Sequence, residues 1–364
     1  MPATEIAARP NAWLEVRRTR GVKAGIMRTS ILRQSLTLLV RGATALLASM
    51  LPVVAAPAVL MQAAVVSHGR LTLRSVPRPI PAAGQVLIEV RAAGVNPADW
   101  KMARMARRMG PDPILGLDAA GTVVALGPAV SGWRVGEAVI AVTGPPHGSY
   151  AQYTVASAQS IAPKPRTLTF EQAAGIPVAG ITAWHALIDI AHLRQGERVL
   201  IDGGAGGVGS AAVQVAKSRG AYVIATARAS NTSYLHSIGA DEVIDYTAGP
   251  FESKVHNVDV VLDTVSPQDG IRAVRTLKPG GWLISLVGRI PAARCAAARI
   301  RCSAPHGSGG LPAGAILDHV VALADAGGYK VSVEHVFPLA DAAEAWRLSE
   351  GGHTRGKLIV IPAH

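Results

Sequence analysis

Cysteine is scarce in this 364-residue chain, which holds only Cys295 and Cys302, both in a segment rich in Ala and Arg. Neither residue belongs to a Cys-x-x-Cys pair, and no other ligand-type side chains cluster beside them in the sequence. This excludes a structural zinc site built on cysteine clusters. The two residues can form a disulfide in an exported protein or stay as thiols in a reducing cytosol, and the sequence leaves both alternatives open.

Aromatic and acidic residues are also few. Phe, Trp and Tyr make up 4% of the chain, and 24 Asp and Glu stand against 36 Lys and Arg, for a formal net charge of +12. Half of this excess lies in residues 1–60, and the rest is scattered without interleaved aromatic residues. A solvated basic surface explains this pattern better than a nucleic-acid site. We therefore expect no nucleic-acid partner.

Charged residues of both signs together make up only 16% of the chain, while 49% of the residues are apolar. This balance is typical of a folded protein and excludes a largely disordered one. The chain is longer than the length at which a single hydrophobic core usually stops growing and a chain divides into domains. We therefore expect two domains and an appendage.

The stretch from Gly42 to Val66 has no charged side chain and is long enough, at roughly 20 residues, to span a bilayer. Residues 27–58 show the basic, apolar and small-residue order of a secretory signal. Alternatively, translation begins at Met61 and residues 1–60 are an artefact or an extension; a retained membrane anchor is the third reading. We expect a cytoplasmic protein, with export through 27–58 as the alternative and membrane association only if the segment is retained.

Two patterns follow this extension. Up to about residue 156, short β-type runs are separated by Pro and Gly, which predicts a mostly antiparallel β domain at 61–185. Apolar strands then alternate with amphipathic helices over 186–312, which predicts a parallel sheet covered on both faces. The stretch 301–314 is loop-like, and 335–361 reads as strand, helix and strand. We expect 313–364 to return to the first domain.

The strongest motif is a glycine-rich turn between a predicted strand and a predicted helix. Gly204, Gly206 and Gly209 form GxGxxG, with Gly207 and Val208 inside it. Small residues let the backbone approach a pyrophosphate, and the helix N-terminus supplies unpaired N–H groups and a partial positive charge. The motif therefore predicts binding of a dinucleotide.

The next strand indicates which dinucleotide is bound. An NAD enzyme usually ends this strand with an acid that binds the ribose hydroxyls, whereas this strand ends in Thr226, Ala227 and Arg228. Arg228 can pair with a 2′-phosphate, and Ser230 and Asn231 can donate hydrogen bonds to it. We therefore expect NADPH rather than NADH, the alternative for Arg228 being a solvent-exposed loop cation.

Several segments, taken in their order and spacing, resemble the medium-chain dehydrogenase/reductase family over nearly all of 61–364. They are GVNPADWK (94–101), PILGLDAAGTVVALG (113–127), GIPVAGITAW (175–184), AGGVG (205–209), GADEVIDY (239–246), LKPGGWLIS (277–285) and HTRGKLIVI (353–361). The resemblance implies an α/β protein in which a GroES-like, β-rich catalytic domain packs beside a Rossmann domain with a doubly wound parallel sheet. The substrate would enter between the two.

The zinc enzymes of this family would have ligands where this chain has Asn96, Leu117 and Val178. A catalytic zinc needs about three Cys, His or carboxylate ligands. The chain therefore resembles the zinc-free, quinone oxidoreductase-like branch, and we expect no metal. The neighbouring Asp99 is interpreted as structural, accepting hydrogen bonds from backbone or Arg donors.

Without a Lewis acid, reduction of an already activated acceptor remains feasible. Hydride transfer from NADPH to a small electrophile such as a quinone or enone fits the resemblance, and we expect Asn96 and Lys101 near the acceptor oxygen. The final proton would come from water. A non-catalytic NADPH sensor and another reductase reaction on the same fold are the alternatives.

The resemblance also implies further cofactor contacts. Residues expected near the nicotinamide are Thr182, Val265, Val287 and Gly288. Tyr246 is expected near the adenosine end, and Lys357 near the cofactor or the seam between the domains. The basic, Met-rich segment 101–110 would belong to the substrate mouth or form an exposed helix with snorkelling cations. Residues 290–314 depart from the family pattern, which leaves substrate identity and a homodimer open.

Overall fold

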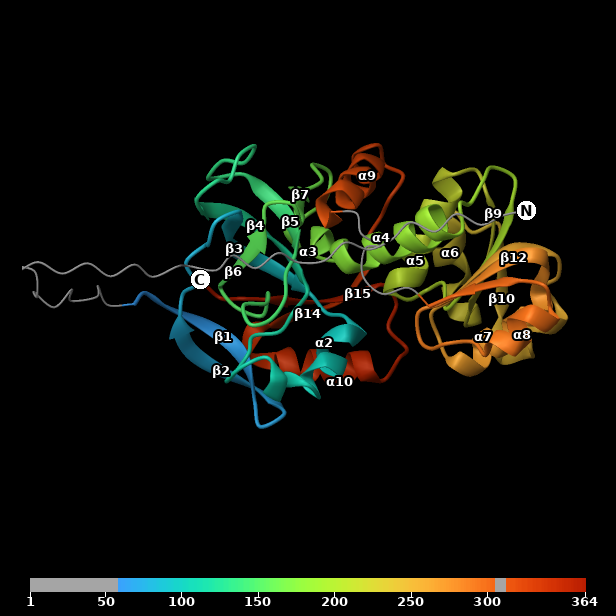
Figure 1. Cartoon of the computed structure of the whole chain (residues 1–364), viewed down its shortest axis with the longest axis horizontal. Helices are drawn as coiled ribbons and strands as arrows, with labels where there is room; N and C mark the ends of the chain where they lie inside the picture. Colours follow the sequence, from blue (N-terminus) through green and yellow to red (C-terminus); the bar gives the residue numbers. More distant parts are fainter. Residues whose placement is uncertain (1–57, 305–311) are drawn as a thin grey trace, which may run out of the picture. The chain divides into compact units, whose positions relative to one another are not determined.

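The structure is a computed structural model that describes residues 58–304 and 312–364 (Figure 1). The described residues form one compact unit, from Ala58 to His364. Nearly all of the proposed signal at 27–58 lies outside the described residues. No helix within the described ranges is long and apolar enough to cross a membrane. The last residues of the uncharged N-terminal run, 60–66, lie in a β-strand, and Met61 is buried.

One half of the unit is built on a seven-stranded sheet, whose strands run from teal to green in Figure 1 except for the red β14 and β15, and whose central pairs are antiparallel. Its strands are β3 (Gln85–Gly94), β4 (Asp118–Leu126), β5 (Ala138–Val142), β6 (Tyr153–Ser157), β7 (Ile161–Pro163), β14 (Val333–Pro338) and β15 (Lys357–Ile361). A hairpin of β1 (Leu60–Ser67) and β2 (Arg70–Pro77) packs beside it, where Ala64 donates a backbone hydrogen bond to Tyr150. The C-terminal strand β15 pairs with β3, so the two ends of the described chain share this half.

The other half contains a six-stranded, all-parallel sheet with the order β10-β9-β8-β11-β12-β13. Its strands are β8 (Arg198–Asp202), β9 (Tyr222–Ala227), β10 (Glu242–Asp245), β11 (Val258–Asp263), β12 (Leu277–Ser285) and β13 (Arg301–Ser303). Its helices are α5 (Gly207–Ser218), α6 (Thr232–Ser237), α7 (Pro267–Ala273) and α8 (Ala292–Ala297). This is the strand order of the Rossmann fold, whose ligands lie at the carboxyl ends of the strands where the order reverses. The predicted fold class is confirmed.

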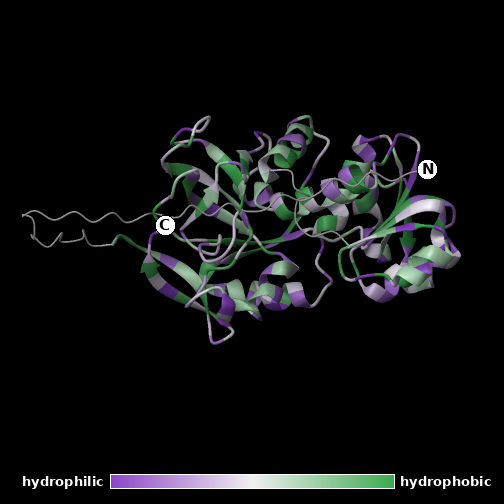
Figure 2. Ribbon diagram, viewed as in Figure 1, coloured by the Kyte–Doolittle hydropathy of each residue, from purple (hydrophilic) through white to green (hydrophobic). Residues whose placement is uncertain are grey.

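A single large core joins the two halves. Ile140 of the antiparallel sheet, Ile201 of the parallel sheet and Val213 of α5 belong to one cluster of buried residues, and Figure 2 shows hydrophobic residues concentrated on the sheet strands. The remaining helices are α2 (Pro97–Ala103), α3 (Phe170–Ala173), α4 (Pro177–Trp184), α9 (Ala313–Asp325) and α10 (Ala342–Glu350). Helix α4 packs against both α5 and α9.

The segment expected to be a loop at 301–314 is partly regular. Arg301–Ser303 form β13, which pairs in parallel with β12, so the prediction was wrong for these residues. The guanidinium of Arg301 lies over the ring of Trp282 and donates two hydrogen bonds to Gly280 O, which holds this short edge strand on the sheet. Helix α9 begins at Ala313. Of the two alternatives for the cysteines, the structure has the Cys295–Cys302 disulfide, which links α8 to β13.

Candidate functional site

The three motif glycines occupy different environments in the turn between β8 and α5. A Cβ added to Gly209 would overlap the carbonyl oxygen of Gly203 and lie 2.8 Å from its carbon, and one added to Gly204 would lie 2.7 Å from Cβ of Ala225. At Gly206 the nearest atom would be 3.6 Å away. Two glycines are therefore needed for packing within the protein, while the third keeps the outer side of the turn open. This division fits a turn that receives a pyrophosphate.

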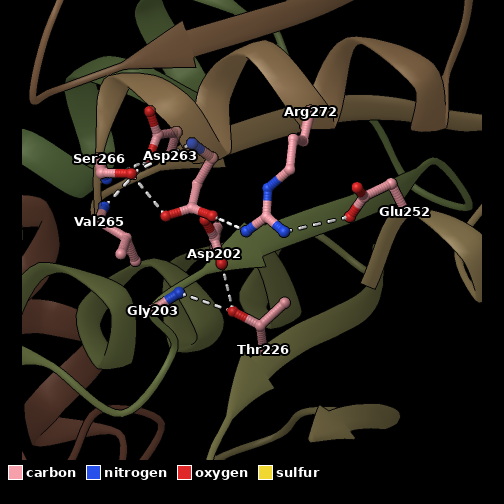
Figure 3. A network of polar contacts seen from close by, with 9 residues as sticks. Asp202, Gly203, Thr226, Glu252, Asp263, Val265, Ser266 and Arg272 are labelled. Atoms are coloured by element: carbon pink, nitrogen blue, oxygen red, sulfur yellow. Dashed lines mark hydrogen bonds and ion pairs between the residues drawn. The ribbon is translucent and has the colours of Figure 1, made fainter. Parts of the chain in front are cut away.

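The base of the turn is held by the ends of β8 and β9 (Figure 3). The amide of Gly203 donates to Oγ1 of Thr226 (2.9 Å), and the same hydroxyl donates to a carboxylate oxygen of Asp202. The amide of Gly204 donates to the carbonyl of Thr226 (2.9 Å). Thr226, which the sequence assigned to the cofactor site, is thus buried beneath the turn, where its contacts position the backbone.

Burial perturbs the acids below the turn. Burial raises the pKa of Asp202 to about 7, and the nearby carboxylates of Asp269 and Asp263 add to this rise. Burial also raises the pKa of Asp263, although its carboxylate accepts a hydrogen bond from the Ser285 hydroxyl (2.7 Å) and two from backbone amides. Arg272 pairs with Asp269 and Glu252 (Figure 3).

The carboxyl end of β9 carries the predicted 2′-phosphate group contacts. Arg228 is exposed, and its Nε donates to the hydroxyl of Tyr246 (3.0 Å). Ser230 and Asn231 follow in a short 3₁₀ turn at Ala229–Asn231. Two residues that the sequence assigned separately to the adenosine end, Arg228 and Tyr246, are therefore side by side.

A buried ion pair lies where the half built on the seven-stranded sheet meets the glycine turn. The ammonium of Lys357 donates to Oδ1 of Asn96 (2.6 Å) and to Oδ2 of Asp118 (3.0 Å), and the Asn96 amide donates to the same Asp118 oxygen (2.9 Å). The other oxygen of Asp118 accepts a hydrogen bond from the amide of Val178 (2.8 Å). We call Asn96, Asp118 and Lys357 the seam triad. Lys357 and Asp118 are 5% and 0% exposed.

The seam triad is in direct contact with the turn. A Cβ at Gly207 would lie 3.0 Å from Cδ of Lys357, and the amide of Gly356 donates to the carbonyl of Ala205 (2.8 Å). Residues 205–207 therefore lie in contact with the start of β15. The aliphatic stem of Lys357 packs against the first residue of α5.

The buried residue Asp99 contacts Asn96 but is not itself part of the seam triad. Its carboxylate accepts hydrogen bonds from the backbone N–H of Asn96 (2.8 Å) and the Tyr150 hydroxyl (2.7 Å), and the Tyr150 hydroxyl in turn accepts one from the Trp346 indole N–H (3.2 Å). Burial raises the pKa of Asp99 to about 7, with these hydrogen bonds opposing the rise. Asn96 is the N-cap of α2 and forms a capping box with Asp99. This cluster therefore fixes the backbone of a seam-triad residue.

The structure does not bring Lys101 to the triad. Lys101 is exposed on α2, and its ammonium lies 5.2 Å from the ring centroid of Trp100. By contrast, three residues assigned to the nicotinamide end follow the carboxyl ends of β11 and β12 at the same edge of the sheet as the turn. They are Val265, Val287 and Gly288. Thr182 lies in α4 and is partly buried. Within residues 58–304 and 312–364, no three His, Cys, Asp or Glu side chains gather as a metal site would require.

Comparison with known proteins gives consistent matches. The profile of the alcohol dehydrogenase GroES-like domain matches residues 82–166, and that of the zinc-binding dehydrogenases matches 238–360. A Danio rerio protein, "NAD(P)H oxidoreductase RTN4IP1, mitochondrial", is 33% identical over 321 residues, covering 76% of this chain and 83% of the relative. A Solanum lycopersicum 2-methylene-furan-3-one reductase is 38% identical over 218 residues, covering 57% and 55%. The structure of the Coxiella burnetii quinone oxidoreductase superposes with a TM-score of 0.74 at 32% identity, covering 83% of this chain and 98% of that one.

Proposed function

The chain belongs to the medium-chain dehydrogenase/reductase family and is quinone oxidoreductase-like, and from this premise we propose an NADPH-dependent, zinc-independent reductase of quinones, enones or similar activated carbonyl acceptors. A nicotinamide cofactor and oxidoreductase chemistry follow from the relatives. The observation that carries the proposed reductase activity is the contact between the open glycine turn and the seam triad. This contact puts the polar donors of the triad beside the turn that would bind the cofactor.

The residues divide the work between binding and charge stabilisation. The bound cofactor supplies a hydride to the acceptor carbon. The turn around Gly206 holds the pyrophosphate at the N-terminus of α5. An ammonium has three protons and an amide has two, whereas Lys357 and Asn96 use two and one in the seam triad. The remaining N–H groups can stabilise the negative charge that develops on the acceptor oxygen, and water delivers the final proton. Lys101 remains a proposed contact at the rim of the site.

Zinc independence rests on the donor set. Leu117 and Val178 carry hydrocarbon side chains, and the side chain of Asn96 is already engaged at both its oxygen and its nitrogen. The adjacent Asp118 is occupied by Lys357 and by the amide of Val178. Since catalytic zinc sites use about three Cys, His or carboxylate ligands, these positions cannot supply a ligand set.

The function is tested by following NADPH consumption with a panel of quinones and conjugated enones against enzyme-free controls. We expect turnover with at least one acceptor class, unchanged after treatment with a chelator. Tight NADPH binding without turnover on any acceptor would favour the sensor alternative. A requirement for stoichiometric zinc would overturn zinc independence.

The preference for NADPH depends on Arg228. We expect Arg228→Ala to weaken NADPH binding by about 10- to 100-fold, the equivalent of one or two charge-assisted hydrogen bonds, while leaving NADH binding unchanged. The measurement is the dissociation constant of each cofactor from nicotinamide fluorescence. Arg219→Ala is the matched control, because Arg219 is also exposed but lies at the C-terminal end of α5, away from the glycine turn. Equal losses for the two cofactors would contradict a role for Arg228 in binding the 2′-phosphate.

The proposed location is the cytoplasm, where the Cys295–Cys302 disulfide would have to resist reduction. The Danio rerio relative carries "mitochondrial" in its name, so targeting or export through the N-terminal segment is the alternative. Mass spectrometry of the native N-terminus distinguishes them, because peptides from residues 1–50 in the mature protein would exclude both a cleaved leader and a start at Met61.

A further inference from the structure

Asp202 has an unusual position for a carboxylate. It is the last residue of β8, directly before the glycine turn, and only 4% of it is exposed. One of its oxygens accepts the Thr226 hydrogen bond, and through this hydroxyl it is linked to the amide of Gly203 (Figure 3). The other oxygen, Oδ2, is buried and has no hydrogen-bond partner among the described residues.

The groups that face Asp202 do not neutralise it. Asp263 at the end of β11 and Asp269 on α7 add negative charge, and both raise the pKa of Asp202 beyond the effect of burial. The cation on this side, Arg272 of α7, lowers the pKa of Asp202, but its ion pairs are with Asp269 and Glu252. In the described part of the chain, no ion pair is formed by Asp202 itself. An ionised Asp202 would therefore be a buried charge that Arg272 and the Thr226 hydrogen bond offset only in part.

A dinucleotide brings further negative charge to the opposite side of the same turn. Like charges repel each other more strongly across poorly polarisable protein than they do in water. Protonation of the carboxylate removes this repulsion, and the neutral acid keeps the acceptor that Thr226 needs. By linkage, a ligand that favours the protonated form must take up protons when it binds.

We propose that Asp202 is a proton-linked positioning residue that holds the glycine turn as a neutral acid in the dinucleotide complex. Where Asp202 is ionised in the free protein, it takes up one proton from solvent when the dinucleotide binds. This inference rests on the proposed function, since it requires the turn to bind a dinucleotide. It predicts that affinity falls as pH rises above neutrality, because more of the free protein must then be protonated on binding. A single coupled proton gives at most about a tenfold change in the dissociation constant per pH unit.

The test uses the full chain with NADPH between pH 6 and 9. Nicotinamide fluorescence gives the dissociation constant, and calorimetry in two buffers of different ionisation enthalpy gives the protons taken up. Asp202→Asn keeps the shape and an acceptor for Thr226 without a titrating group. Asp318→Asn, an exposed acid on α9, is the matched control.

We expect the wild type and Asp318→Asn to bind more weakly with rising pH and to take up protons at pH 8, while Asp202→Asn shows a flatter profile and takes up fewer protons. A merely structural role would shift the dissociation constant of Asp202→Asn equally at every pH. The same slope and proton uptake in Asp202→Asn as in the wild type would overturn the inference alone. Absence of proton uptake by the wild type at pH 8 would overturn it even if the variant did not fold. If the wild type bound no NADPH at any pH, the proposed function would fall with it.

Discussion

Lys357→Met is expected to lower the free energy of unfolding by about 3–5 kcal/mol, the usual loss when one partner of a buried ion pair is removed. The side chain of Asp118 is fully buried and shares one oxygen between Lys357 and Asn96. Methionine keeps much of the stem that packs on Gly207 but leaves the carboxylate without its cation. Denaturant unfolding, compared with wild type, measures the loss.

Two further variants separate charge from packing. Lys330→Met changes an exposed lysine and is expected to alter stability by less than about 0.5 kcal/mol. The double variant Lys357→Met with Asp118→Asn removes both charges and should recover part of the lost stability, because the stranded carboxylate is gone. Reductase activity should stay low in the double variant if the ammonium stabilises the acceptor oxygen. A Lys357→Met protein as stable as Lys330→Met would refute the seam triad as a stabilising pair.

The fold was predictable because its signals are local. Alternating apolar strands and helices after residue 186 predicted a parallel sheet, and the glycine turn has a spacing that can be recognised without knowing the rest of the chain. The glycine spacing also identified Gly204, Gly206 and Gly209 before their different environments were visible. The short strand β13 was not predicted because its three residues resemble a loop, and only pairing with β12 makes them a strand.

The polar contacts of the site were less predictable because they join distant segments. Lys357 and Asp118 are separated by 239 positions, and nothing in either local pattern indicates that they pair. The sequence analysis placed Lys101 beside Asn96 in the site, whereas the lysine that contacts Asn96 comes from the far end of the chain. Asp202 was not singled out, although an acid at the end of a buried strand, just before a glycine turn, was a usable signal. Tyr150 reaches Asp99 through tertiary packing alone.

Gly209→Ala and Gly206→Ala are expected to fail in different ways. The new Cβ at residue 209 would overlap the carbonyl oxygen of Gly203 and lie 2.9 Å from Cα of Gly204. These are backbone atoms, so α5 must move away from the end of β8. Overpacking of this kind costs about 1–3 kcal/mol, and at roughly 2–4 °C per kcal/mol the midpoint of thermal unfolding should fall visibly. NADPH binding should fall as well, because the turn is displaced.

Gly206→Ala is the matched variant, because its backbone angles of φ −74° and ψ 177° suit alanine and its nearest neighbour would be 3.6 Å from the new Cβ. Its thermal midpoint should therefore stay close to that of the wild type, with a loss of less than about 1 kcal/mol at this helix N-cap. A methyl group would nevertheless stand on the side of the turn where a pyrophosphate approaches, so we expect at least about a tenfold weaker dissociation constant for NADPH. Wild-type affinity in Gly206→Ala would mean that the phosphates bind elsewhere, and wild-type stability in Gly209→Ala would mean that α5 can shift without cost.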